Sequence, residues 1–248
     1  MQFVWLEMRK RRYFSLCSSN LQHEDQKEAE VKRAKPSSMT NNIDNDDKDD
    51  EDDSKQLPIP VCHNIVSTSQ ITSSLEEINL QRLASLFPFT SYDRKRFAAI
   101  TIRLANPHCT CLLFGSGKLV ITGSTSFHAC LIASQTITEL LRQVNPRERF
   151  EVISCTIQNI VAHVELQPNQ RIDLEAVYEK YCEHSTYQKS IFPGLVLRPP
   201  ESPIVLLIFK SGRIVCTGGK SYNDIYFGFM KMFKVLRNYI VMSEDNKA

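Results

Sequence analysis

The sequence predicts an α+β fold made of two direct repeats, and two observations carry this prediction. First, residues 206–220 have a twin at 112–123, and each stretch is an apolar run, a Ser-Gly-basic tripeptide and a second apolar run that stops at Thr-Gly. Apolar runs of strand length joined by a Gly-containing turn are typical of a β-hairpin. Second, apolar residues at helical spacing follow each hairpin, at about 126–142 and 221–241. Antiparallel strands with helices segregated to one face are therefore expected.

The two hairpins stand 95 residues apart, and the same offset relates most of the chain between 61 and 241. It places Asn64 on Asn159, and it places Thr122 on Thr217 (217 − 122 = 95). Two copies are too few for a solenoid, which needs about three or more units to bury a continuous core. We therefore expect one pseudo-two-fold domain over 58–248, with repeat one at about 61–145 and repeat two at about 150–241.

Residues 1–57 have a different composition from the rest of the chain. They lack glycine, and Asp44 to Asp53 carries eight acidic side chains in ten positions. Such a segment cannot bury enough apolar surface to offset its ordering entropy, so a disordered acidic N-terminal region is predicted. One hypothesis is that this region screens a cationic surface of the folded part. The folded part carries 20 Lys and Arg against 15 Asp and Glu, which is a mild positive balance.

Local signals place the elements of each repeat in order. Residues 61–72 alternate β-branched and polar side chains, as a half-buried strand does. Asn106-Pro107 marks a turn between two strands, Ser126 is a helix cap, and Asn145-Pro146 ends the first repeat. Repeat one is predicted to hold strands at 61–72, 97–105, 110–114 and 118–122 and helices at 75–87 and 126–142. Repeat two is predicted to hold strands at 150–166, 193–197, 204–209 and 213–217 and helices at 172–182 and 221–241.

The helices of the two repeats leave one face of the sheet unassigned. Strand alternation puts Leu112 and Phe114 on one face, and it does the same for Val120 and Thr122 and for their counterparts in repeat two. An open face with such residues would be an exposed apolar patch, which usually marks a surface that binds a partner. Alternatively, these side chains meet a second layer of structure. Periodicity favours neither interpretation.

Several classes of protein are disfavoured by composition. Eight cysteines without a Cys-x-x-Cys pair indicate an intracellular, reduced protein, and Cys109 and Cys111 are expected to pack in the core and not to bind a metal. No apolar run approaches the ~18 residues of a membrane span. Arg9–Arg12 is a weak nuclear-import signal. Paired carboxylates, a nucleophile–base pair and a phosphate-binding Gly loop are not evident, so we expect no enzyme, no cofactor and no small-molecule ligand.

Long paired motifs in register resemble the TATA-box-binding protein (TBP) family over about 61–241. They include Gln158-Asn-Ile-Val161, Ile191-Phe-Pro-Gly-Leu195 and Leu206-Leu-Ile-Phe-Lys-Ser-Gly212, with Arg96-Phe-Ala-Ala99 in repeat one. The resemblance implies a saddle: a curved ten-stranded antiparallel sheet whose concave face lies on the DNA minor groove, with helices on the convex face.

The resemblance also implies roles for individual residues on that concave face. The intercalating wedges would be Phe97, Phe114, Phe192 and Phe209. The minor-groove contacts would be Asn64, Val66, Ala98, Leu112, Val120, Thr122, Asn159, Val161, Pro193, Leu207, Val215 and Thr217. The phosphate contacts would be Arg96, Arg103, Lys118, Arg198, Arg213 and Lys220. Asparagine and threonine donors suit adenine N3 and thymine O2, because the floor of an A·T tract presents only acceptors.

The chain departs from the family pattern at several places. Thr125 and His108 stand where the family has basic residues, and residues 126–139 lack the basic side chains of the family's first long helix. Residues 187–191 replace an acidic loop that docks a basal initiation factor. These departures favour a divergent, TBP-related member, with one phosphate flank weaker and less sensitive to salt.

Two functions follow from the resemblance. The first is a nuclear transcription initiation factor that binds and bends TATA-like promoter DNA and nucleates a preinitiation complex with basal factors and RNA polymerase machinery. The alternative is a TBP-related adaptor that protein partners recruit to promoters, with weak sequence preference of its own.

Overall fold

The structure is a computed structural model that describes residues 57–73 and 77–242. These residues belong to one structural unit. The acidic run at 44–53 and the basic cluster at 9–12 lie outside the described residues. The described residues span both repeats.

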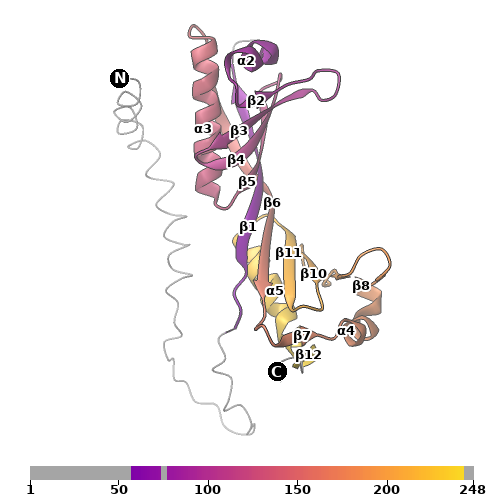
Figure 1. Ribbon diagram of the computed structural model, residues 1–248. Coiled ribbons are helices and arrows are strands. Elements are labelled where there is room, and N and C mark those ends of the chain that lie inside the picture. The colour runs from indigo at the N-terminus through magenta and orange to yellow at the C-terminus, as the bar shows by residue number, and fades with distance from the viewer. Residues whose placement is uncertain (1–56, 74–76, 243–248) are drawn as a thin grey trace, which may run out of the picture. The chain divides into compact units, whose positions relative to one another are not determined.

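The described residues form one ten-stranded antiparallel sheet, as predicted, and a separate two-stranded sheet (Figure 1). The order of strands in the large sheet is β2-β3-β4-β5-β1-β6-β11-β10-β9-β8. Its strands are β1 (Val61–Thr72), β2 (Thr90–Ser91), β3 (Ala99–Ala105), β4 (His108–Phe114), β5 (Lys118–Ser124), β6 (Glu151–Glu165), β8 (Ser185–Thr186), β9 (Leu195–Leu197), β10 (Val205–Ile208) and β11 (Arg213–Gly219). The small sheet pairs β7 (Gln170–Ile172) with β12 (Ile240–Met242).

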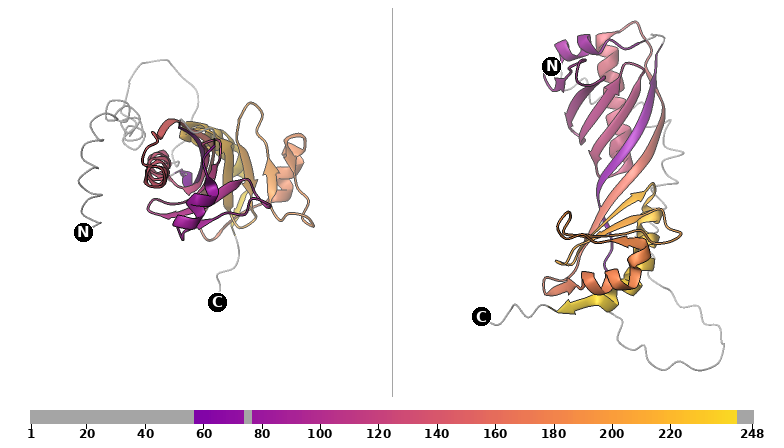
Figure 2. Two further views of the ribbon diagram at one scale, coloured as in Figure 1. Left: turned by 90° about the horizontal axis from the view of Figure 1, so that it is seen from above. Right: turned by 90° about the vertical axis from the view of Figure 1, so that its right-hand side faces the viewer.

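The strand order shows the pseudo-two-fold relation that the 95-residue offset predicts. The first five strands of the sheet come from repeat one and the last five from repeat two, in mirrored order. The long strands β1 and β6 pair antiparallel at the centre, and Figure 2 shows them running between the two groups of strands. One continuous sheet therefore carries both repeats.

Four α-helices accompany the sheet in the described residues: α2 (Leu80–Leu86), α3 (Phe127–Val144), α4 (Leu174–Tyr181) and α5 (Tyr222–Leu236). The Ser126 side chain caps α3 as predicted, accepting from the Ala129 N–H at 3.1 Å. Ser221 and Asp224 form a capping box at the start of α5. Helix α3 packs on β1, β5 and β6, and α5 packs on β6 and β11 (Figure 1). None of these described helices is long and apolar enough to cross a bilayer.

Three predicted helix boundaries are wrong. The helix expected at 75–87 begins at Leu80, where Asn79 accepts from a backbone N–H of the first turn. The helix expected at 172–182 begins after the Asp173 cap and gives way to a 3-10 turn, Cys182–His184. The helix expected at 221–241 ends at Leu236, and residues 240–242 form β12 instead. This strand is stabilised by pairing with β7, a partner about 70 residues away in sequence.

The predicted strands differ from the structure mainly at their starts. Residues 97–98 and 193–194 precede β3 and β9 and do not belong to those strands. The two-residue strands at the sheet edges, β2 and β8, were not predicted. Both are too short to produce a periodic pattern, and they complete the ten strands.

Alternation along each strand separates a buried face from a half-exposed face. On β4, for example, Cys109, Cys111 and Leu113 are buried on the helix side, whereas Leu112 and Phe114 lie on the other side. The expected packing role of the two cysteines is confirmed. In the described part of the chain no second layer covers the other face, so the open-face interpretation holds.

The layers under the two long helices differ in kind. The α3 layer contains Cys130, Ser134 and Thr138, all buried, and the Ser134 hydroxyl lies 2.7 Å from that of Ser69 on β1. At the same offset positions α5 carries Ile225, Phe229 and Phe233, which are also buried. At these three positions repeat one thus carries small or polar side chains, whereas repeat two carries large apolar ones.

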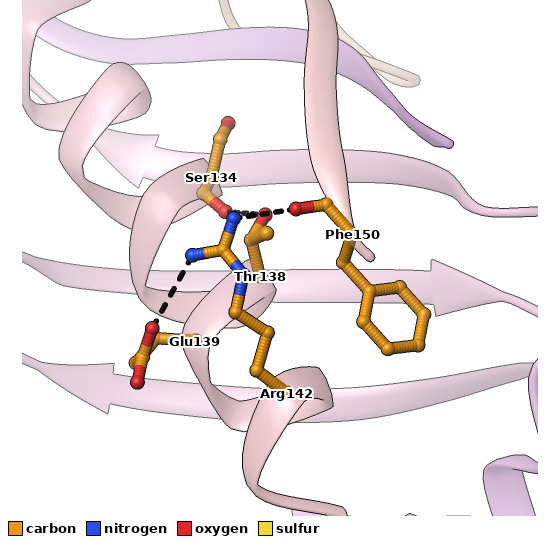
Figure 3. Close-up of polar contacts among 5 residues, drawn as sticks. All are labelled: Ser134, Thr138, Glu139, Arg142 and Phe150. Atoms are coloured by element: carbon orange, nitrogen blue, oxygen red, sulfur yellow. Dashed lines mark hydrogen bonds and ion pairs between the residues drawn. The ribbon is translucent and has the colours of Figure 1, made fainter. Parts of the chain in front are cut away.

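The outer side of α3 joins the two repeats near its C-terminal end. Arg142 donates to the carbonyl oxygen of Phe150, just before β6, at 2.5 Å and pairs with Glu139 at 3.3 Å (Figure 3). On the same helix Ile137 and Leu141 are buried, whereas Ile132 is 38% exposed.

Candidate nucleic-acid interface

The open face of the sheet carries ten of the predicted contact residues in five matched pairs, and all ten are half-buried. They stand on β1 and β6, on β4 and β10, and on β5 and β11. The pairs are Asn64 with Asn159, Val66 with Val161, Leu112 with Leu207, Val120 with Val215, and Thr122 with Thr217. The fold therefore brings together residues spread over more than 150 positions of sequence.

Four of these residues meet at the centre of the sheet. In the β1–β6 ladder Asn64 lies opposite Val161, and Val66 lies opposite Asn159. Facing residues on neighbouring strands have Cβ atoms about 5 Å apart. Two asparagines and two valines thus form a compact central group around the pseudo-two-fold axis.

Each central asparagine is held in a fixed orientation by a glycine N–H. The side-chain amide oxygen of Asn64, Oδ1, accepts from Gly123 N at 2.7 Å, and Oδ1 of Asn159 accepts from Gly218 N at 2.8 Å. Thr122 and Thr217 lie next to these amides, with Oγ1 at 3.4 and 3.2 Å from the same oxygens. Because an N–H donor requires the oxygen end of the amide, the NH₂ end of each asparagine is directed away from its glycine. At Asn159 one N–H of this NH₂ lies within bonding distance of Thr217 Oγ1, at 3.1 Å, and the other N–H is left to face a ligand.

The two glycines supply a backbone geometry that other residues rarely adopt. Gly123 has φ of 91° and Gly218 has φ of 97°, both in the region that favours glycine. This conformation, at the ends of β5 and β11, turns the N–H toward the asparagine. The Thr-Gly that ends each hairpin is therefore part of the site, a role that the sequence analysis did not assign to the glycines.

Cross-strand pairs of apolar side chains flank the central group on both sides. Leu112 lies opposite Val120 in the β4–β5 ladder, and Leu207 lies opposite Val215 in the β10–β11 ladder. These pairs give each repeat an apolar surface that offers no hydrogen-bonding group. Such a surface is compatible with groove atoms that need no donor.

Two phenylalanine pairs lie farther out from the centre, one in each repeat. The ring centroids of Phe97 and Phe114 are 5.9 Å apart at 66°, and those of Phe192 and Phe209 are 5.6 Å apart at 68°. Both are edge-to-face contacts, a favoured geometry for aromatic rings. Phe97 is 49% exposed although it is a large apolar residue. Phe114, Phe192 and Phe209 are half-buried, and none of the four phenylalanines belongs to the buried core.

A glycine allows the tighter pair in repeat two. A Cβ at Gly194 would stand 2.7 Å from Phe192 Cε1 and 3.1 Å from Phe209 Cε1. The residue at the same position in repeat one is Ala99, where the rings are slightly farther apart. Ala98 and Pro193, the remaining predicted apolar contacts, are exposed next to Phe97 and Phe192, outside the strands.

All six predicted phosphate contacts are exposed. They are Arg96, Arg103, Lys118, Arg198, Arg213 and Lys220. Arg103 lies within β3, and the other five lie at strand ends or in the segments that flank strands. Arg213 also pairs with Glu165 on the neighbouring strand at 3.7 Å. Since both side chains of this pair are about half exposed, the pair is worth little to stability, and Arg213 remains accessible to an anion.

The departures from the family pattern lie on the surface as well. His108 begins β4 and is exposed, and Thr125 is exposed between β5 and α3. In the 187–191 loop Lys189 forms an ion pair with Glu175 of α4. Ile191 is the most exposed large apolar residue of that loop.

Within the described residues no group of three or more His, Cys, Asp and Glu side chains is arranged to hold a metal ion. The site consists of amides, hydroxyls, apolar side chains and cations. These are groups that bind a ligand through hydrogen bonds, apolar contacts and charge.

Fold and site thus define a class: two-repeat proteins with a ten-stranded sheet that helices cover on one face only. The family described as "Transcription factor TFIID (or TATA-binding protein, TBP)" matches residues 59–144 and 154–239, one match to each repeat. The chain belongs to this family.

Individual relatives agree with this assignment. A TATA-box-binding protein-like 1 of Entamoeba histolytica is 34% identical over 222 residues, which cover 86% of this chain and 99% of that protein. TATA-box-binding protein 2 of Arabidopsis thaliana is 35% identical over 73% of this chain and 87% of its own length. The TATA-box-binding protein of Drosophila melanogaster is 34% identical over 73% of this chain, but the match spans only 49% of that protein. Among solved structures, Methanococcus jannaschii TBP matches with a TM-score of 0.61 and 29% identity, covering 73% of this chain and 99% of that one.

Proposed function

We propose that the chain is a transcription initiation factor whose open sheet face binds the minor groove of A·T-rich promoter DNA. The observation that carries this proposal is the matched pair of central asparagines, each oriented by a glycine N–H. Asn64 and Asn159 each spend the amide oxygen on a glycine N–H, and each keeps at least one N–H of the amide NH₂ for the ligand. Donors at the centre of an apolar surface match a groove floor that offers A N3 and T O2 acceptors and lacks the guanine amino donor.

The apolar pairs around the central asparagines suit the same ligand. Leu112 with Val120, and Leu207 with Val215, carry no polar group that the groove floor would have to satisfy. A guanine amino group facing these side chains would be desolvated without a partner, at a cost of about 1–3 kcal/mol. Preference for A·T over G·C base pairs follows.

The two phenylalanine pairs supply the means of bending. An apolar wedge inserted at a base step costs a few kcal/mol of unstacking and opens the groove onto more protein surface. The Phe97–Phe114 and Phe192–Phe209 pairs stand at matched positions on either side of the centre, so each would act on one end of the site. The bend would then be distributed between two steps.

Exposed Arg and Lys side chains near the strand ends position the phosphates. Each phosphate contact contributes counterion release, so binding weakens as salt rises. His108 and Thr125 add no permanent charge in repeat one, and we expect a smaller salt dependence from that repeat than from repeat two. In the cell this activity belongs in the nucleus, with basal transcription factors and RNA polymerase machinery as the protein partners.

The test compares DNA binding and bending by wild type and two phenylalanine variants. Gel shift and end-to-end energy transfer on an A·T-rich TATA duplex give affinity and bend for Phe192→Ala/Phe209→Ala. Phe227→Ala is the matched control, because Phe227 is 64% exposed on α5, the helix that covers the other face. We expect a sharp bend that the double variant loses and the control keeps.

Equal binding of the wild type to any duplex, or binding without a bend, would refute the proposal. Either result would support the alternative in which protein partners recruit the chain to promoters.

A further inference from the structure

Strands β1 and β6 each contain a β-bulge directly before the central asparagine. In the β1–β6 ladder Cys62 pairs with Ala162 and Asn64 with Val161, so His63 is the extra residue on β1. Val66 pairs with Asn159 and Ser67 with Ile157, so Gln158 is the extra residue on β6. A bulge re-aims the side chain of the extra residue. The offset of 95 relates His63 to Gln158, and the two bulges obey the pseudo-two-fold relation although the residues differ.

The contacts of the two bulge residues break this symmetry. Gln158 Nε2 donates to Thr68 Oγ1 at 2.8 Å. The residues at the related positions are His63 and His163, whose rings meet edge-on with centroids 5.5 Å apart at 84°. One half of the sheet therefore carries an amide–hydroxyl pair and the other half an imidazole pair.

The imidazole pair belongs to the open face. His163 follows Asn159 and Val161 at every second position of β6, whereas Ile160, Ala162 and Val164 are buried on the helix side. His63 is exposed. His163 Nδ1 is out of contact with water and, among the described residues, has no hydrogen-bond partner. Leaving a buried polar nitrogen without a partner costs free energy in the unbound protein.

The surroundings place the pair in the repeat-two half of the surface. His163 lies opposite Val61 on β1 and opposite Val215 on β11. Glu165 is two residues farther along β6 and forms the ion pair with Arg213 of β11. The carboxylate that faces this region is thus engaged by a guanidinium. His63 also directly precedes the central asparagine Asn64 in sequence.

We propose that His63 and His163 are a further DNA-contacting pair that distinguishes the two halves of the bound site and so sets the orientation of the protein on DNA. The inference rests on the proposed function. The two orientations of a pseudo-symmetric protein on an asymmetric duplex differ only through contacts that the two repeats do not share. An imidazole and an amide present different hydrogen-bonding groups to the DNA, and the Gln158 amide already spends one of its two N–H donors on Thr68.

The test measures orientation directly. A cleavage reagent attached to the exposed Cys182, in a full-length Cys17→Ser background, cuts the DNA near the end that repeat two binds. The ratio of cuts at the two ends of an asymmetric A·T-rich duplex reports the orientation ratio. The symmetrised variant His63→Gln/His163→Thr gives repeat two the pair that repeat one has. We expect it to lower the ratio about fivefold, the effect of one hydrogen bond, with total affinity changed by less than about threefold.

The reciprocal variant Gln158→His/Thr68→His places the imidazole pair in both halves and should lower the ratio equally. This variant also serves as the test if the first one fails to fold. An orientation ratio that neither variant changes, on DNA that both still bind and bend, would overturn this inference alone. Wild-type protein that neither binds nor bends the duplex would overturn the proposed function as well.

Discussion

Changing Asn64 to Asp separates folding from DNA binding. The side-chain oxygen Oδ1 of Asn64 accepts from Gly123 N at 2.7 Å, and a carboxylate oxygen of an aspartate at this position can accept the same bond. A charged acceptor strengthens such a bond, and this gain offsets the cost of a charge on a half-buried side chain. We therefore expect the free energy of unfolding to change by less than about 1 kcal/mol. Asn64→Ala removes this hydrogen bond, and because Gly123 is exposed and water can replace the partner, the variant should cost about 1 kcal/mol.

The order of the two variants reverses for DNA. Alanine loses one donor to the groove, worth about 1 kcal/mol. Aspartate loses the donor and also sets a carboxylate against acceptor atoms and phosphates, and such like-charge contacts cost several kcal/mol. We expect affinity to fall about fivefold for Asn64→Ala and about a hundredfold or more for Asn64→Asp, since 1.4 kcal/mol is tenfold.

Urea titration and fluorescence anisotropy on one labelled duplex measure both quantities for each variant. The reasoning fails if the aspartate variant is the less stable of the two, or if it binds DNA as well as the alanine variant does. Either result would mean that the amide is not oriented as the glycine contact requires.

Three further predictions concern the folded unit. Ser134 Oγ donates to the Cys130 carbonyl at 3.0 Å and so accepts from Ser69. Ser134→Ala should therefore lower the free energy of unfolding in urea by about 1–3 kcal/mol, which is more than Ser69→Ala should lower it. The double variant should lose less stability than the two single variants do together. Burial raises the pKa of the Cys216 thiol to about 12, so at pH 8 a thiol reagent should modify exposed Cys182 quickly and leave Cys216 intact until the protein unfolds; peptide mapping that finds both modified at one rate would contradict this. Gly117 has φ of 81°, and a Cβ there would stand 2.1 Å from a backbone carbonyl oxygen of β1, so an alanine variant should melt well below wild type in a thermal scan, and an unchanged Tm would refute the packing argument.

Much of the fold could be predicted from the sequence because each local signal occurs in both repeats, so that one copy supports the interpretation of the other. The hairpin at 112–123 is ambiguous by itself, but its twin at 206–220 identifies it as part of a repeated unit and puts Leu112 and Leu207 at matched positions. Periodicity alone did not decide whether their face of the sheet is open. Elements without a periodic signal were missed for the same reason. β12 depends on pairing with β7, and residues 240–242 by themselves continue a helical pattern.

The site divides along similar lines. Asn64, Asn159 and the four phenylalanines belong to motifs that can be compared between repeats, and the structure brings them together as matched sets. The imidazole pair could not be predicted in this way, because the contact between His63 and His163 depends on a bulge and on the pairing of two strands. The only sequence signal was the failure of the repeat at these two positions.

Amide hydrogen exchange should make the unlike layers under the two long helices visible in time. Lifting α3 from the sheet exposes Cys130, Ser134 and Thr138, whereas lifting α5 exposes Ile225 and two phenylalanines. Apolar area resists exposure at roughly 25 cal/mol per Å², so α3 opens at lower free energy and its amides exchange first. A molecule that loosens on warming would thus lose the backing of the Phe97–Phe114 end while the Phe192–Phe209 end stays formed. On heating, the Phe97–Phe114 end of the surface would then lose DNA binding at a lower temperature than the Phe192–Phe209 end.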